Sequence, residues 1–266
     1  MFRLLVVLGL MLASGAQAAD AMRLAVTTSF HNSGLADVLL PEIKSDLGLE
    51  VQLLVVGTGQ ALRLGRAGDV DAILVHSRAA EDAFVADGFA THRREIMFND
   101  FVFIGPAADP AGVSDATSAV EALTRIATTG ARFVSRGDDS GTHKKEVSLW
   151  ARAGGLPEAE WYKEVGAGMG AALNTAVGLG GYILSDRASW LNFGNKGDLA
   201  LLYAGDPILF NQYAYLAVNP AAHRHVMAEQ AAQLEAWLTS PRAGELIDGY
   251  EIAGERLFEF NAQAME

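Results

Sequence analysis

Short runs of β-branched and other apolar residues alternate with longer amphipathic stretches along most of this chain. The run at 24–27 is followed by a helical pattern at 35–47, and the run at 51–56 by another at 61–68. Strands that alternate with helices in this way are typical of sheets whose faces are covered by helices. The pattern therefore predicts an α/β fold.

The same alternation predicts further elements in the rest of the chain. Expected strands are 72–75, 101–104, 132–135, 181–185, 199–203 and 213–218, and expected helices are 117–127, 142–153, 171–178 and 220–240. No internal repeat, low-complexity run or Pro-rich linker divides the sequence. A chain of 266 residues without such a division favours one domain or two lobes.

Residues 1–18 have the three parts of a secretory signal peptide. Arg3 precedes an apolar run at 4–13, and Ala16-Gln17-Ala18 has the small-residue form of a cleavage site. The apolar run is much shorter than the roughly 20 residues that a membrane-spanning helix needs. We expect cleavage after Ala18 or Ala19, and a mature protein in the periplasm.

The charge and the missing cysteines exclude several functions. Lys and Arg number 20 against 32 Asp and Glu, a net charge of -12, which argues against general binding of nucleic acid or acidic membranes. Without Cys we expect no disulfide scaffold, thiolate metal site, cysteine nucleophile or lipid anchor on an N-terminal Cys. The pair His223 and His225 has no matching second pair, so we expect no metal site. Any anionic ligand must be held by local donors.

Hydroxyl groups gather where the first predicted strand ends. Thr28 and Ser29 precede the helical pattern that begins at Leu35. Backbone N–H groups at a helix start have no partner in the helix, so hydroxyls there can bind an anion together with them. Simple capping of the helix is the alternative interpretation.

A second polar segment follows the strand at 51–56. Gly57 and Gly59 lie on either side of Thr58, whose hydroxyl is a further donor. Glycines allow the backbone to approach a ligand closely, although they also suit a tight turn. A dinucleotide fingerprint is excluded, because its third glycine would fall at Leu62.

The most informative segment is 135–146, which runs from a predicted strand through a polar loop into a predicted helix. Arg136 offers a planar fork of donors for an oxyanion, and Gly141 exposes a backbone N–H group at the helix start. Ser140 and Thr142 add hydroxyls. The segment predicts an oxyanion-binding loop.

Two carboxylates in this loop would weaken anion binding unless they face away from the ligand. Asp138 and Asp139 would repel a bound anion if they faced it, whereas they could cap the helix or hold the fork of Arg136 in place. A surface loop with an Asp cap, which binds nothing, is the alternative interpretation.

A hydrolytic site is the main enzymatic alternative for this loop. Residues 137–141 are similar to a serine-protease nucleophile loop, but His143 follows too closely to be aimed at Ser140. The sequence contains neither a G-x-S-x-G elbow nor a G-x-x-x-x-G-K-[ST] loop. We expect no catalytic residues and no enzymatic activity.

Over nearly the whole mature chain, the sequence resembles the tungstate-binding proteins of ABC importers, most specifically in the loop 135–146. Other matching residues are 27–29 with 33–35, 56–62, 68–69 with 71, 75–76 with 81 and 84, 99–102 with 105–106 and 109–112, 161–162, 168–170, 182 with 184 and 186–187, and 218–220. Two departures are Val26, where the family usually has Thr, and Ala188-Ser189, where Gly-Thr is expected.

The resemblance implies a type II periplasmic binding protein with two α/β lobes, joined by two crossing strands that form a hinge. Lobe 1 would comprise residues 19–101 plus 212–266, and lobe 2 residues 102–211. The crossings would lie at 99–105 and 211–218, which are rich in aromatic and β-branched residues as paired strands are. Ligand binding in the cleft would select the closed arrangement of the lobes.

The resemblance also implies the ligand, its site and its partners. The expected ligand residues are Thr28, Ser29 and Thr58 from lobe 1, with Ser135, Arg136, Ser140, Gly141 and Thr142 from lobe 2. The ligand would be tungstate, delivered to the permease and ATPase subunits of an ABC importer. We expect a monomer that needs no cofactor and binds no nucleic acid.

Other oxyanions remain alternatives. Arg136, Ser140, Gly141 and Thr142 have a spacing that also resembles phosphate-binding carriers, whereas a hydrolase of phosphate or sulfate esters lacks any metal cluster or base that we can name. Tungstate and molybdate are dianions of nearly the same size, so their chemistry does not separate them.

Protonation separates tungstate from phosphate. Tungstate only accepts hydrogen bonds, whereas phosphate at neutral pH carries a proton and needs an acceptor. A tungstate site therefore predicts that Asp138 and Asp139 point away from the ligand.

Overall fold

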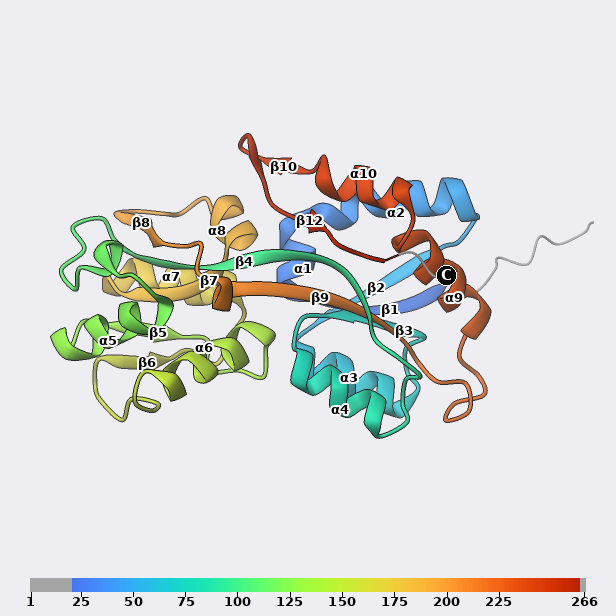
Figure 1. Cartoon of the computed structure of the whole chain (residues 1–266), viewed down its shortest axis with the longest axis horizontal. Helices are drawn as coiled ribbons and strands as arrows, with labels where there is room; N and C mark the ends of the chain where they lie inside the picture. Colours follow the sequence, from blue (N-terminus) through green and yellow to red (C-terminus); the bar gives the residue numbers. More distant parts are fainter. Residues whose placement is uncertain (1–20, 264–266) are drawn as a thin grey trace, which may run out of the picture.

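The computed structural model describes residues 21–263 as one long mixed sheet with groups of helices packed at its two ends (Figure 1). The predicted signal peptide at 1–18 lies outside the described residues. Within 21–263, no helix is both long enough and apolar enough to cross a membrane. The prediction of an α/β fold is confirmed.

The strands of the main sheet follow the order β2-β1-β3-β9-β4-β7-β5-β6. Their bounds are β1 Met22–Thr27, β2 Val51–Val56, β3 Ala72–Val75, β4 Arg94–Pro106, β5 Phe133–Ser135, β6 Tyr162–Glu164, β7 Tyr182–Asp186 and β9 Phe210–Ala217. Two further strands pair with β4, namely β8 Leu199–Tyr203 and β12 Glu259–Phe260. A separate hairpin joins β10 Glu251–Ile252 to β11 Glu255–Arg256.

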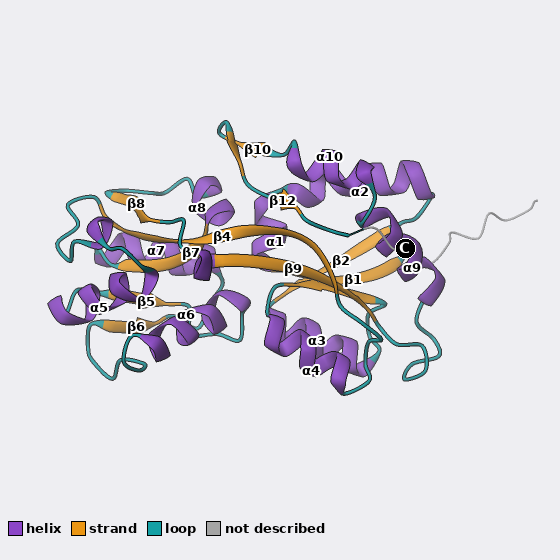
Figure 2. Cartoon of the chain, in the orientation of Figure 1, coloured by secondary structure: helices purple, strands orange, loops and turns teal. Residues whose placement is uncertain are grey.

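The long antiparallel strands β4 and β9 run through the middle of the sheet and connect its two ends (Figure 2). On one side β1 pairs in parallel with β2 and β3, and on the other side β5 pairs in parallel with β6 and β7. We call the part built on β1, β2 and β3 lobe 1, and the part built on β5, β6 and β7 lobe 2. The lobe boundaries given above stay a prediction.

The first crossing strand is longer than the sequence predicts. Residues 94–100 of β4 pair with β9, and residues 101–104 pair with β7, so the strand begins well before the expected crossing at 99–105. The sequence pattern did not predict the start of β4, because Arg94 and Glu95 interrupt the apolar pattern there. β4 therefore passes from one lobe to the other as one continuous strand.

The helices of lobe 1 are α1 Thr28–Ser33, α2 Leu35–Leu47, α3 Thr58–Ala67, α4 Arg78–Ala86, α9 Ala228–Leu238 and α10 Pro241–Asp248. Leu39 of α2, Leu234 of α9 and Ile247 of α10 share one buried cluster with residues of β1 and β9. Leu62 of α3 and Phe84 of α4 lie in a second cluster. Helices thus cover both faces of this part of the sheet.

The helices of lobe 2 are α5 Ala119–Thr129, α6 Gly141–Arg152, α7 Met169–Leu179 and α8 Arg187–Asn192, with short 3-10 turns η1 Val113–Asp115 and η2 Pro207–Leu209. Leu123 of α5 and Trp150 of α6 pack in one cluster, and Leu173 of α7 and Trp190 of α8 in another. The same layered arrangement therefore occurs twice in the molecule.

The predicted helix at 220–240 is wrong in its first part. Residues 219–227 form turns instead, because the side chain of Asn219 accepts a hydrogen bond from the N–H of Ala221 at 3.0 Å. The N–H of Met227 then binds Oδ1 of Asp71 at 2.9 Å, which fixes the chain before α9 begins at Ala228. Side-chain bonds of this kind compete with the helix and are not visible in hydrophobic periodicity.

Candidate functional site

The hydroxyls after β1 lie on a short helix that the sequence pattern did not predict. Thr27 caps α1, accepting the N–H of Phe30 at 3.2 Å, and Thr28 is the first residue of the helix. Gly34, with a φ of 80°, separates α1 from α2. The polar cluster therefore begins α1 rather than the longer helix at Leu35.

Ser29 lies at the centre of a buried hydrogen-bond network. Its Oγ is 3.0 Å from Oγ1 of Thr27, 3.0 Å from Nε2 of His76 and 3.2 Å from the hydroxyl of Tyr213. Burial lowers the pKa of His76 to about 3, so the ring is neutral. Burial also raises the pKa of Tyr213, which keeps its proton. Two neutral groups thus hold the Ser29 hydroxyl in place.

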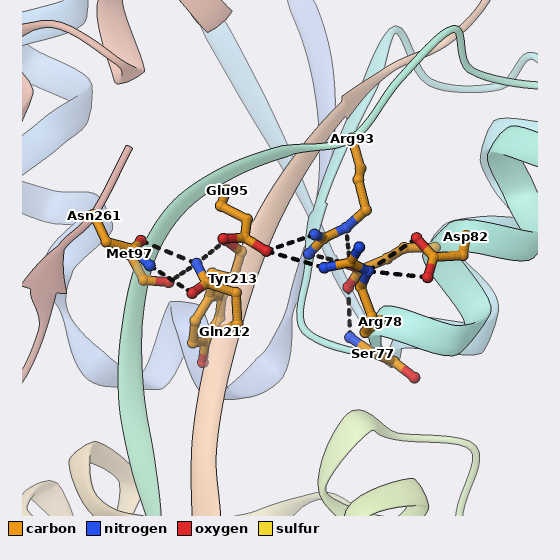
Figure 3. Close-up of polar contacts among 10 residues, drawn as sticks. Ser77, Arg78, Asp82, Arg93, Glu95, Met97, Gln212, Tyr213 and Asn261 are labelled. Carbon is orange, nitrogen blue, oxygen red and sulfur yellow. Dashed lines mark hydrogen bonds and ion pairs between the residues drawn. The ribbon is translucent and has the colours of Figure 1, made fainter. Parts of the chain in front are cut away.

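The segment after His76 is anchored by charged residues. The N–H of Ser77 donates to the buried carboxylate of Glu81, which pairs with Arg93 at 2.9 Å. Arg93 also pairs with Glu95 of β4 at 2.7 Å. Figure 3 shows Arg93 directed toward Glu95, beside the start of α4. This network ties the end of β3, and with it His76, to the crossing strand.

The segment 57–59 contacts the opposite lobe. The N–H of Gly59 donates to the carbonyl oxygen of Asp139 at 3.2 Å, and a Cβ atom on Gly59 would lie 1.3 Å from Oδ2 of Asp139. The glycine therefore admits Asp139, which the sequence interpretation did not foresee. Within the described chain, the buried Oγ1 of Thr58 has no hydrogen-bond partner.

Helix α6 begins directly against the network of lobe 1. Ser140 caps the helix, accepting the N–H of His143 at 3.1 Å, and Gly141 is its first residue. A Cβ atom on Gly141 would lie 2.4 Å from Cε1 of His76. Thr142 is buried beside it. The starts of α3 and α6 thus meet at the boundary between the lobes.

Arg136 is almost completely buried and is held by its own loop. Its guanidinium pairs with Asp138, whose other oxygen accepts the N–H of Ser140 at 3.1 Å. Asp138 therefore holds the fork of Arg136, one of the two tasks that the sequence allowed, whereas the helix itself is capped by Ser140. Nε of Arg136 is buried and makes no hydrogen bond to any described residue.

Asp139 has different partners. Its carboxylate pairs with Lys144 of α6 and with Arg63 of α3 at 3.2 Å. Partial burial raises its pKa, but the hydrogen bonds and charges of Lys144 and Arg63 outweigh this and lower it. Both aspartates are thus committed to cationic side chains. Their orientation toward a bound ligand stays a prediction.

The remaining expected residue, Ser135, bonds within its own loop. Its Oγ accepts the N–H of Gly137 at 3.1 Å, so it stabilises the turn that carries Arg136. The structure brings Ser29, Gly141 and the segment around Thr58 to one place, with Arg136 joined to Ser140 through Asp138. The assignment of the eight residues as ligand contacts stays a prediction.

Four residues near this place escaped the analysis of the sequence as ligand or positioning residues, namely His76, Tyr213, Asp186 and Ser189. Asp186 is completely buried at the end of β7 and caps α8, accepting the N–H of Ser189 at 2.8 Å. Its second oxygen and the Ser189 hydroxyl have no partner among residues 21–263. His76 and Asp186 lie in stretches that match the family and Ser189 in one of its two departures, but these stretches alone assign them no role.

A metal centre finds no support in this arrangement. The part of the chain that the structure describes contains no group of three or more His, Asp or Glu side chains placed to hold a metal ion. Hydroxyl groups, the starts of α3 and α6 and the buried Arg136 lie near this boundary. Donors at helix starts, with one arginine, suit an oxyanion.

Comparisons with known proteins agree with this chemistry. Residues 13–242 match the PBP superfamily domain. The chain is 44% identical to the tungstate-binding protein TupA of Peptoclostridium acidaminophilum over 252 residues, covering 92% of this chain and 87% of that protein.

Solved structures give the same result. The tungstate ABC transporter structure from Geobacter sulfurreducens matches with a TM-score of 0.81 and 46% identity, covering 88% of this chain and 100% of that one. The tungstate-binding protein TupA from Desulfovibrio alaskensis G20 matches with a TM-score of 0.81 and 44% identity, covering 92% and 100%. The chain therefore belongs to the PBP superfamily and, within it, to the family of the tungstate-binding proteins TupA.

Proposed function

We propose that this chain is the substrate-binding component of an ABC importer and captures tungstate between its two lobes. Its relatives carry the names of tungstate-binding proteins, which are binding proteins rather than enzymes. The observation that carries the proposal is a set of buried donors from both lobes without partners in the described chain, namely Thr58 Oγ1, Arg136 Nε and Ser189 Oγ. A dianion that only accepts hydrogen bonds can satisfy them together.

We propose the eight residues expected from the sequence as the ligand-binding set, namely Thr28, Ser29, Thr58, Ser135, Arg136, Ser140, Gly141 and Thr142. His76 and Tyr213 would act behind them by fixing the Ser29 hydroxyl. Because Asp138 balances the charge of Arg136, the site has little net positive charge. The N–H groups at the starts of α3 and α6 would therefore supply much of the attraction.

The contacts between the lobes explain how binding could favour closure. Gly59 meets Asp139, and Gly141 meets His76, only when the two lobes are close together. An anion that bonds to donors on both lobes stabilises this arrangement over an open one by its differential affinity. The importer would then recognise the closed protein.

The partners and the location follow as parts of the same proposal. The permease and ATPase subunits would receive tungstate from this protein, and the signal peptide at 1–18 would direct it to the periplasm as a monomer. Molybdate is a second candidate ligand, because its size and charge nearly equal those of tungstate. Phosphate is less well supported, because Asp138 and Asp139 already bind cations and offer no evident acceptor for its proton.

Calorimetric titration of the mature protein with tungstate, molybdate, sulfate and phosphate tests the proposal. We expect one tungstate per chain, binding of molybdate in the same site, and no displacement of tungstate by millimolar phosphate at pH 7. Failure to bind tungstate, or ready competition by phosphate, would overturn the assignment.

A further inference from the structure

Asp186 has a buried carboxyl group in which only one of the two oxygens makes a hydrogen bond to a described residue. It is the last residue of β7, none of its surface is exposed, and Oδ1 accepts the N–H of Ser189 at 2.8 Å. Oδ2 is buried as well and has no partner among the described residues. Capping of α8 explains one oxygen and leaves the other unexplained.

Several contacts place Asp186 beside the ligand residues. It pairs in the sheet with Phe101 of β4, whose ring centroid lies 6.1 Å from that of His76. His76 in turn contacts Ser29 and the start of α6. From the other end of α8, Asn192 donates to the carbonyl oxygen of Asn32 on α1 at 2.8 Å. Asp186 thus lies at the same boundary between the lobes.

The two arginines near Asp186 are both paired with other carboxylates. The charge of Arg136 reaches Asp186, but Asp138 pairs with Arg136, and the adjacent Arg187 pairs with Asp100 of β4 at 2.6 Å. On α6, Lys145 binds the carbonyl oxygen of residue 208 at 2.9 Å.

The other facing groups are neutral. His76 is neutral because burial lowers its pKa, and Tyr213 because burial raises its pKa. An ionised Asp186 would therefore add a third negative charge next to a bound dianion without a cation of its own. Burial raises the pKa of Asp186, although the hydrogen bond from the N–H of Ser189 and the charge of Arg136 oppose this.

We propose that Asp186 contacts the bound oxyanion as a neutral carboxylic acid, with the Oδ2–H group donating a hydrogen bond to it. This inference rests on the proposed function, since it adds a donor to that site. Oδ1 keeps the N–H of Ser189, so one carboxyl group both caps α8 and binds the ligand. Such a donor favours anions that only accept hydrogen bonds, because a protonated anion would meet donor against donor.

Two substitutions separate ligand binding from helix capping. Asn and Ser are both good caps, so Asp186→Asn and Asp186→Ser should each preserve α8. The Asn amide also offers an N–H group in the place of Oδ2–H, whereas Ser is too short to do so. We expect Asp186→Asn to bind tungstate within about threefold of the parent, and Asp186→Ser to bind at least about tenfold more weakly, the usual cost of losing a bond to a charged group.

The dependence of binding on pH gives a second test of the neutral form. The affinity of the parent for tungstate should fall as the pH rises and Asp186 ionises, and Asp186→Asn should show a flatter profile. Melting temperatures of the unliganded proteins serve as the control for folding. Equal binding by the parent and Asp186→Ser would show that Asp186 is only a cap, and strong loss in Asp186→Asn would show that it acts as a carboxylate. Either result refutes this inference alone, whereas a parent that binds no tungstate refutes the proposed function.

Discussion

Replacement of Gly141 by Ala tests whether the contact between the lobes controls binding. The new Cβ atom would lie 2.4 Å from Cε1 and 2.5 Å from Nδ1 of His76, about 1 Å closer than the 3.4 Å at which ordinary contacts begin. His76 cannot turn away easily, because it is 7% exposed and bonded to Ser29. The lobes must therefore separate or the buried ring must move.

Overpacking of this kind typically costs about 1 to 3 kcal/mol. If the full cost falls on the closed, liganded state, tungstate affinity should drop by about 5- to 150-fold. Calorimetric titration measures this drop directly. The melting temperature of the unliganded protein should change little, because opening of the cleft removes the clash.

Gly178 provides a matched control, since it also lies in a helix and a Cβ atom there would meet nothing within 4 Å. Gly178→Ala should leave affinity unchanged and stabilise the protein by up to about 1 kcal/mol through helix propensity. If Gly141→Ala binds tungstate as tightly as Gly178→Ala does, the contact with His76 does not govern closure and the reasoning fails.

Three further predictions follow from the same structure. Arg136→Ala should weaken tungstate binding by about 2 to 5 kcal/mol, with partial rescue in Arg136→Lys, because Lys keeps the charge but loses the fork; unchanged affinity in titration would remove Arg136 from the site. Burial raises the pKa of Glu146 from 4.5 to about 7, so stability should be lost as the pH rises through this range. Glu146→Gln should therefore raise the melting temperature more at pH 8 than at pH 5, and an equal effect at both would contradict this. Small-angle scattering should show a smaller radius of gyration with saturating tungstate, and an identical profile would argue against closure.

The sequence predicted best those parts of the candidate site whose residues are close together in the chain. Hydroxyls and glycines at 57–59 and 140–142 precede predicted helices, so their position at helix starts could be predicted, whereas the short helix that begins at Thr28 could not. The contacts of Asp138 with Arg136 and Ser140 could also be anticipated, because both partners are two residues away.

The site residues that the sequence did not predict make contacts with residues far away in the chain. His76 and Tyr213 meet Ser29 only through pairing of β3 with β9, and Asp186 comes from β7 in the other lobe. Isolated His, Tyr and Asp residues give no local signal of such a role. The contact of Gly59 with Asp139 was missed for a related reason, since the two residues are 80 positions apart.

The most direct test of the whole account is a crystal structure of the mature protein with tungstate, recorded with the anomalous signal of tungsten. The account predicts one strong anomalous peak per chain at the boundary of the lobes, within hydrogen-bonding reach of the tungstate oxygens from Ser29, Thr58 and Arg136. A peak elsewhere on the protein, or a well-ordered complex in which these residues do not touch the ligand, would contradict it.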